Sequence, residues 1–182
     1  MQDWIVIGAG ATLKHYIVGV KKLIRNYNLV TIGINNMTDY IIPDYQLFTN
    51  FKRLKDGKVK FNKKLIITQK LVDLAVWIAQ LNFDIISDDI NLYRTAGCRA
   101  IQYAYDHGAD NIYVAGMDGY TLCYGGDQHC WGFGNTDSDD GEYEAEKDAI
   151  IYNCLRGLKS SGIIFEIITP TVYNEFYNGR VI

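Results

Sequence analysis

The chain has 182 residues, of which 48% are hydrophobic, and its formal net charge at pH 7 is −3. This length and hydrophobic content suit one ordinary domain core, whereas the slight acidic excess argues against a dedicated nucleic-acid binder, which needs basic residues for phosphates. The sequence has no uninterrupted apolar span of bilayer length, so we expect no integral membrane segment.

The first residues and the cysteines bear on the cellular compartment. Residues 1–4 lack a positively charged region followed by an apolar stretch, so no secretory signal is predicted. The four cysteines form no C-x-x-C pair, which disfavours a zinc ribbon or a thioredoxin-like motif. We therefore expect a reduced, cytoplasmic protein.

Apolar runs alternate along the chain with stretches of helical spacing. Strands are predicted at residues 4–7, 29–34, 45–49, 65–68, 111–115 and 163–168, and helices at 12–26, 95–107 and 142–161. Strands that are apolar on both faces and separated by helices indicate a mostly parallel, twisted sheet with helices on both faces. The sequence thus predicts an α/β fold with a single Rossmann-like domain over residues 1–182. Residues 71–93 and 121–142 have mixed patterns and are candidates for flaps, the second as a lid loop.

Ligands of such sheets bind outside the carboxyl ends of the strands, so the residues that directly follow each strand are the candidate site. The first strand ends in a tight turn with Gly8 and Gly10, and the N–H groups of a turn that opens a helix suit a phosphate. A plain strand-to-helix turn is the alternative. Leu13 replaces the third glycine of a dinucleotide fingerprint, and no acidic residue ends the second strand. A nicotinamide cofactor is therefore disfavoured.

Amide side chains follow the next two strands. Asn35 and Asn36 end the second strand, and Asn50 follows the third. An amide both donates and accepts hydrogen bonds, so these groups suit a pyrimidine or ribose edge and do not repel phosphate. Each asparagine alone is also typical of a turn or a helix cap.

Two more groups flank the helix predicted at 95–107. Arg94-Thr95-Ala96-Gly97 precedes or opens it, and Thr95 is either an N-cap or a donor to an anion at the helix N-terminus. Asp118 follows the strand at 111–115, where it would face the cleft and order a sugar hydroxyl or a base. Tyr120 and Tyr124 offer phenolic donors to a departing phosphate. An aromatic cluster under a loop is the alternative for the tyrosines.

His129 lies in the polar, glycine-rich stretch at 124–142, whereas His15 and His107 fall on predicted helices. A histidine beside the strand ends suits a general base, and a merely exposed histidine is the alternative. The sequence has neither a paired-histidine metal motif nor the Gly-Lys-Ser/Thr of a P-loop.

Taken in order, these motifs resemble bacterial sialyltransferases that have a single-Rossmann, GT-A-variant fold. The similarity covers most of the chain, and its most specific part runs from Arg94-Thr95-Ala96-Gly97 through a helix and Gly108 to residues 112–118 and Tyr120. The resemblance implies transfer of sialic acid from CMP-sialic acid to a carbohydrate acceptor, a galactoside, with no metal cofactor.

The resemblance also implies roles for single residues. The residues that would bind the donor nucleotide are Gly8, Gly10, Asn35, Asn36, Asn50, Arg94, Thr95, Ala96 and Gly97. Tyr120 and Tyr124 would stabilise the leaving phosphate, and His129 would deprotonate the acceptor hydroxyl. Ala96 stands where the family often has serine, and Ala11-Thr12 replaces the usual Pro-Ser of the first turn.

Two other functions stay open. The glycine turn also resembles that of archaeal pterin diphosphokinase relatives, which use ATP and magnesium; here Asp44 and Asp118 would have to lie close together. The short chain and the altered turn also suit a non-catalytic nucleotide-binding module. A homo-oligomer is compatible with either function.

Overall fold

The computed structural model describes residues 2–56, 59–86, 95–122 and 141–179. Within these ranges the chain forms one seven-stranded sheet in the order β5-β4-β3-β2-β1-β6-β7, with every pair of neighbours parallel. The strands are β1 (Gln2–Ile7), β2 (Val30–Ile34), β3 (Tyr45–Phe48), β4 (Lys64–Thr68), β5 (Phe83–Ile86), β6 (Ala109–Ala115) and β7 (Phe165–Ile167). The predicted α/β class and Rossmann-like sheet are confirmed.

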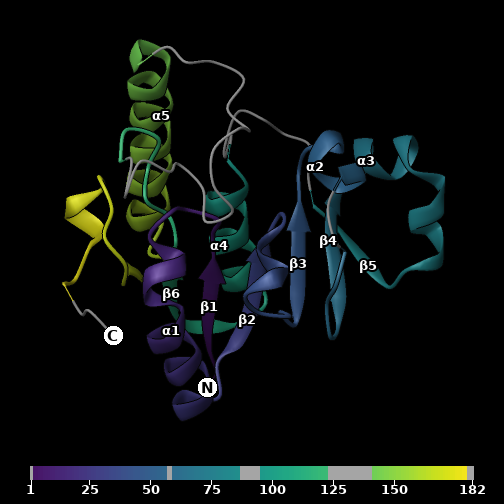
Figure 1. Cartoon of the computed structure of the whole chain (residues 1–182), viewed down its shortest axis with the longest axis horizontal. Coiled ribbons are helices and arrows are strands. Elements are labelled where there is room, and N and C mark those ends of the chain that lie inside the picture. Colours follow the sequence, from purple (N-terminus) through teal and green to yellow (C-terminus); the bar gives the residue numbers. More distant parts are fainter. Residues whose placement is uncertain (1, 57–58, 87–94, 123–140, 180–182) are drawn as a thin grey trace.

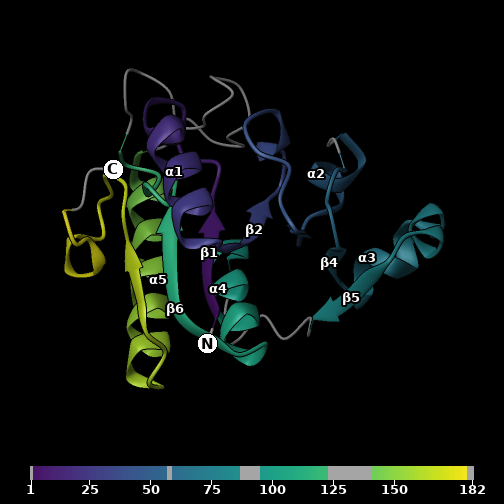
Figure 2. The same cartoon turned by 90° about the horizontal axis from the view of Figure 1, so that it is seen from below.

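Helices cover both faces of this sheet (Figures 1 and 2). They are α1 (Leu13–Tyr27), α2 (Phe51–Asp56), α3 (Gln69–Leu74), α4 (Ala96–Asp106) and α5 (Gly141–Ser160). Ile5 and Ile7 of β1 pack with buried residues of α1, whereas Trp4 and Val6 point to the other face, where α4 and α5 pack. The alternation of side chains along a strand accounts for this division.

The edge strand β5 is the main element that the sequence did not predict. Residues 71–86 complete α3, form a 3-10 helix (Val76–Gln80) and add β5 beside β4. This segment extends the sheet and contributes no residue to the cavity described below; residues 87–93 of the flap expected at 71–93 lie outside the described residues. The strand was hard to detect because it has four residues and its Ile85 is 50% exposed.

The order of the strands sets the place of the site. The chain builds the sheet outward from β1 to β5, then crosses through residues 95–106 to place β6 on the other side of β1. The strand order therefore reverses between β1 and β6, and open α/β sheets bind ligands at such a point, beyond the carboxyl ends of the strands.

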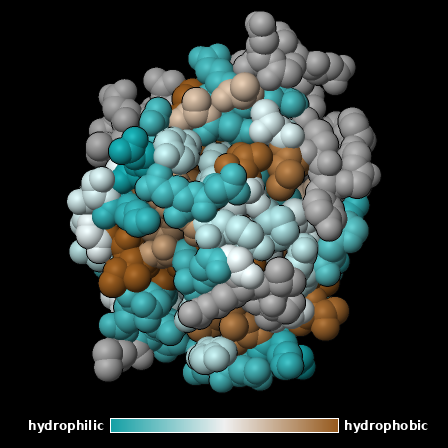
Figure 3. Space-filling model, turned by 90° about the vertical axis from the view of Figure 1, so that its left-hand side faces the viewer, coloured by the Kyte–Doolittle hydropathy of each residue, from teal (hydrophilic) through white to brown (hydrophobic). Residues whose placement is uncertain are grey.

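The side of the molecule that carries the C-terminal segment shows hydrophilic side chains interrupted by smaller hydrophobic areas (Figure 3). Among the helices of the described residues, none is sufficiently long and apolar for a bilayer crossing.

Candidate functional site: a cavity where the strand order reverses

A cavity of about 350 Å³ lies at the carboxyl ends of β1, β2, β3 and β6. Its walls collect most of the residues that the sequence selected: Gly8, Gly10, Asn35, Asn50, Thr95, Ala96, Gly97, Asp118 and Tyr120. Asn36 does not line it; this residue precedes a 3-10 helix (Met37–Asp39). Arg94, Tyr124 and His129 lie outside the described residues. The predicted strand-end residues thus converge from four strands and the N-terminus of α4.

The glycine turn after β1 is held by the chain itself. The Gly8 N–H donates to the Ala115 carbonyl (2.7 Å), and the Gly10 N–H donates to the Gly116 carbonyl (2.8 Å). A Cβ at Gly8 would overlap the Gly116 carbonyl, and one at Gly10 would overlap the Asp118 carboxyl group. The two glycines therefore allow the turn after β1 to pack directly on the turn after β6.

Asp118 closes this contact at the N-terminus of α1. Its carboxylate accepts hydrogen bonds from the Thr12 N–H (2.7 Å) and from the Thr12 hydroxyl (2.6 Å). The side chain is 2% exposed, and burial raises the pKa of its carboxyl group to about 6, although the two bonds from Thr12 act in the opposite direction. A carboxylate of the protein thus occupies the end of α1, where a phosphate binds in dinucleotide-binding folds. From the sequence, a nucleotide phosphate was expected at the backbone N–H groups of this turn. The N–H groups of Gly8, Gly10 and Thr12 instead donate to groups of the protein.

The N-terminus of α4 forms another wall of the cavity. The Thr95 hydroxyl caps the helix by accepting the Cys98 N–H (3.3 Å), and the Thr95 carbonyl accepts the Arg99 N–H (3.1 Å). The amides of Ala96 and Gly97 precede the first intrahelical bond and lie at the positive end of the helix dipole. A Cβ at Gly97 would overlap the end of the flexible Met117 side chain, which packs against this glycine. Thr95 therefore is an N-cap and also lines the cavity.

Asn50 places two cations on the cavity wall. Its Oδ1 accepts the N–H groups of Lys52 (2.9 Å) and Arg53 (3.4 Å), so it fixes the start of α2, and both cations line the cavity. The sequence reading missed these cations, although they follow Asn50 almost directly. Lys147 of α5 lines the cavity from the opposite side; no local signal pointed to it, because only the packing of α5 brings it there.

Asp148 fixes the turn that carries Tyr120. Its carboxylate accepts hydrogen bonds from the Tyr120 N–H (2.7 Å), the Thr121 N–H (2.9 Å), the Thr121 hydroxyl (2.6 Å) and the Tyr173 hydroxyl (2.8 Å). Burial is the main cause of the raised pKa of Tyr173, which keeps that phenol protonated as a donor. The Nζ atom of Lys147 lies 4.9 Å from the centre of the Tyr120 ring. Asp148 of α5 thus fixes the turn that carries Tyr120, and the neighbouring Lys147 places a positive charge beside the Tyr120 ring.

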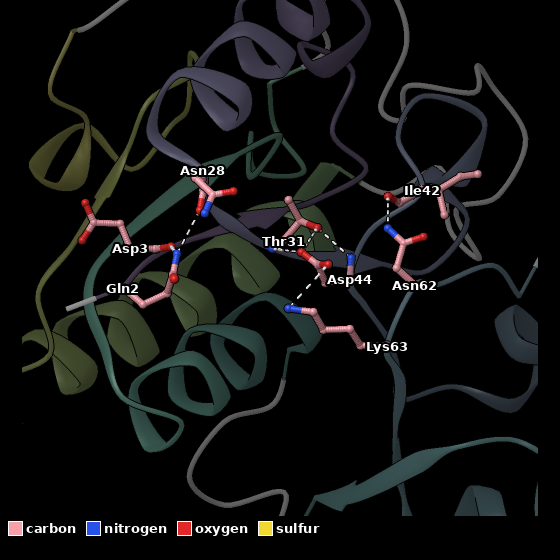
Figure 4. A network of polar contacts seen from close by, with 8 residues as sticks. All are labelled: Gln2, Asp3, Asn28, Thr31, Ile42, Asp44, Asn62 and Lys63. Carbon is pink, nitrogen blue, oxygen red and sulfur yellow. Dashed lines mark hydrogen bonds and ion pairs between the residues drawn. The ribbon is translucent and has the colours of Figure 1, made fainter.

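Asp44, the second carboxylate expected near a metal ion, lies elsewhere. It precedes β3 at the amino end of the sheet, where it accepts the Thr31 N–H and the Thr31 hydroxyl (both 3.0 Å) beside Lys63, 3.7 Å away (Figure 4). It does not line the cavity that Asp118 lines. The described residues also contain no group of three or more His, Cys, Asp and Glu side chains placed to hold a metal ion. The carboxylate pair that a magnesium-dependent diphosphokinase would need is therefore not formed by Asp44 and Asp118.

No protein-family model matches the sequence, and no curated protein matches it either.

Proposed function

We propose that the protein is a glycosyltransferase of the sialyltransferase-like kind, which transfers a sugar from a nucleotide-linked donor, with CMP as the nucleotide, to a carbohydrate acceptor. The observation that carries the proposal is the cavity at the β1–β6 reversal, where neutral amides, a helix N-terminus and three cationic side chains line one space. Such a set suits a ligand with an anionic group and a polar, uncharged portion.

The phosphate of the donor binds at the N-terminus of α4. Lys52, Arg53 and Lys147 surround the same cavity and compensate the charge that develops on the leaving phosphate. The glycine turn does not bind the phosphate, because the Gly10 and Thr12 amides donate to groups of the protein. Asp118 accordingly holds the turn in place and takes no proton from the substrate.

The nucleoside binds on the side of β2 and β3. Asn35 lines the cavity, and its Oδ1 has no hydrogen-bond partner among the described residues. An enclosed acceptor without a partner costs about 1–3 kcal/mol, which a donor group of the ligand recovers. Asn50 uses its Oδ1 on α2 and keeps its side-chain N–H groups for the ligand.

The transfer step requires a base for the acceptor hydroxyl and acid groups for the phosphate. His129 is the proposed base, and Tyr120 and Tyr124 are the proposed donors to the leaving phosphate, as the resemblance implies. Of these three residues, Tyr120 is within the described residues, and it lines the cavity beside Lys147.

Thermal unfolding of the full chain with CMP, UMP, GMP and ATP tests the proposal. A ligand at one hundred times its Kd adds about 2.7 kcal/mol of stability, which raises the Tm of a chain of this size by several degrees. We expect CMP to give the largest rise without added divalent ions. No rise with any of the four nucleotides would overturn the proposal, and a rise with ATP alone that needs magnesium would favour the diphosphokinase.

A non-catalytic nucleotide-binding module is the second candidate. It is favoured because the buried carboxylates of Asp118 and Asp148 both accept hydrogen bonds from the protein itself. His129→Ala separates the two functions: an enzyme loses sugar transfer and keeps its affinity for CMP, whereas a binding module shows no transfer by the wild-type chain.

A further inference from the structure

Asn35 has an unusual backbone conformation at the end of β2. Its φ is 54°, in the left-handed region that L residues other than glycine seldom adopt and that asparagine tolerates best. Strained backbone of this kind persists only where the surrounding structure holds it. Two neighbouring residues of β3 do so here.

The polar backbone groups of Asn35 are both bound by β3. The Asn35 N–H donates to the Leu47 carbonyl (3.0 Å), and the Asn35 carbonyl accepts a hydrogen bond from the Gln46 Nε2 (2.8 Å). The first bond continues the ladder between β2 and β3, in which Leu47 pairs with Ile34. The second comes from a side chain, so it depends on the residue type at position 46.

Gln46 is itself fully buried and fixed at its other end. It is 0% exposed, and its Oε1 accepts the Lys60 N–H (2.7 Å). A buried amide side chain is unfavourable unless its hydrogen bonds are satisfied. With one end bound to Lys60, the Nε2 group has little freedom and holds the Asn35 carbonyl in one place.

We infer that Gln46 is a positioning residue for ligand recognition: it holds Asn35 in the left-handed conformation that presents the Asn35 amide to the nucleotide. The inference rests on the proposed function, because the ligand of Asn35 is taken to be the nucleotide in the cavity. Asn35 lines that cavity, and its buried Oδ1 has no hydrogen-bond partner among the described residues. The ligand group that suits this acceptor is a donor, a ribose hydroxyl or the amino group of a base.

A double-mutant cycle distinguishes positioning from a general structural role. The variants are Gln46→Met, Asn35→Ala and the two combined, and the measurement is the affinity for CMP by calorimetric titration. If Gln46 acts through Asn35, Gln46→Met weakens binding about five- to tenfold in the wild-type chain, as the loss of one hydrogen bond does. In the Asn35→Ala background the same change has no further effect.

A matched control removes a similar bond far from the cavity. Thr31→Val deletes the hydroxyl that bonds to Asp44 at the amino end of the sheet, and it should leave the affinity for CMP unchanged. Equal losses from Gln46→Met in both backgrounds, or no loss in either, would overturn the inference. Gln46→Leu serves if Gln46→Met does not fold, because leucine also lacks the donor to the Asn35 carbonyl.

A ligand-free measurement keeps this inference separate from the proposed function. The backbone NMR signals of Asn35, including its HN–Hα coupling, report its φ angle in the free protein. We expect them to change in Gln46→Met and not in Thr31→Val. Unchanged Asn35 signals in Gln46→Met would refute the role of Gln46, whereas a wild-type chain that binds no CMP would refute the proposed function alone.

Discussion

Two aspartates at opposite ends of the sheet make the same hydrogen bonds in different surroundings. Asp118 accepts the N–H and hydroxyl of Thr12, and Asp44 accepts the N–H and hydroxyl of Thr31. Asp118 is buried against Gly10, whereas Asp44 is partly exposed beside Lys63. Water can therefore replace the Asp44 carboxylate as an acceptor, whereas the site of Asp118 is closed to water.

This difference supports the end of the sheet at which we propose that an anion binds. At the carboxyl end of the sheet, the negative charge of Asp118 neutralises the N-terminus of α1. The cations and the N-terminus of α4 line the cavity there. At the amino end the carboxylate and Lys63 balance each other near the surface.

Removing each carboxylate should reveal the difference in burial. Asp118→Ala leaves the buried Thr12 N–H and hydroxyl without acceptors, and we expect it to lower the free energy of unfolding by about 3 kcal/mol. Asp44→Ala should cost about 1 kcal/mol or less, because the Asp44 carboxylate is partly exposed and water can take its place. Urea unfolding of both variants measures the two losses, and equal losses would contradict the comparison.

Gly10→Ala should be the next largest effect. The new methyl group overlaps the Asp118 carboxyl group, and overpacking of this kind costs about 1–3 kcal/mol. Gly157→Ala is the control, since a Cβ at Gly157 of α5 meets no neighbouring atom and alanine favours a helix. The same urea assay applies, and a neutral Gly10→Ala would show that the turn does not pack on Asp118 as described.

The free energy of unfolding should depend on pH through the titration of the Asp118 carboxyl group. Burial raises the pKa of this carboxyl group to about 6 in the folded chain, above the ordinary value of 3.8, so between these values the folded state binds more protons than the unfolded state. The contribution of Asp118 to the free energy of unfolding is therefore fully present below about pH 4 and is lost as the pH rises to about 6. This change is on the order of 2 kcal/mol.

Asp118→Asn removes this titration. The difference in unfolding free energy between wild type and Asp118→Asn should decrease steadily from pH 4 to pH 6. A constant difference between wild type and Asp118→Asn would show that Asp118 does not titrate there.

The smallest expected effects are those of the cations. Lys52→Gln, Arg53→Gln and Lys147→Gln should each weaken CMP binding about three- to fivefold at low salt, and less at high salt, because charges at the cavity attract the phosphate. Lys63→Gln at the amino end of the sheet should leave binding unchanged. Calorimetric titration at two salt concentrations measures this, and equal effects of Lys63→Gln and Lys147→Gln would contradict the placement of the phosphate.

Much of the fold follows from local pattern, because buried parallel strands are continuous apolar runs and the helices between them have a clear period. The strand-end rule then found Asn35 and Asn50, and the predicted start of a helix found Thr95; each of these signals is local to one strand or helix. Periodicity does not order the strands in the sheet, so the pairing of the Gly10 turn with Asp118 was not predictable. For the same reason Lys147 and the buried Gln46 were missed, since their roles depend on contacts across the sheet.

A crystal structure of the full chain with CMP tests where the nucleotide binds. We expect the nucleotide in the cavity at the β1–β6 reversal, with its phosphate within hydrogen-bond distance of the Ala96 and Gly97 amides. A phosphate bound to the amides of Gly10 and Thr12 with Asp118 displaced, or CMP bound away from the cavity, would contradict it.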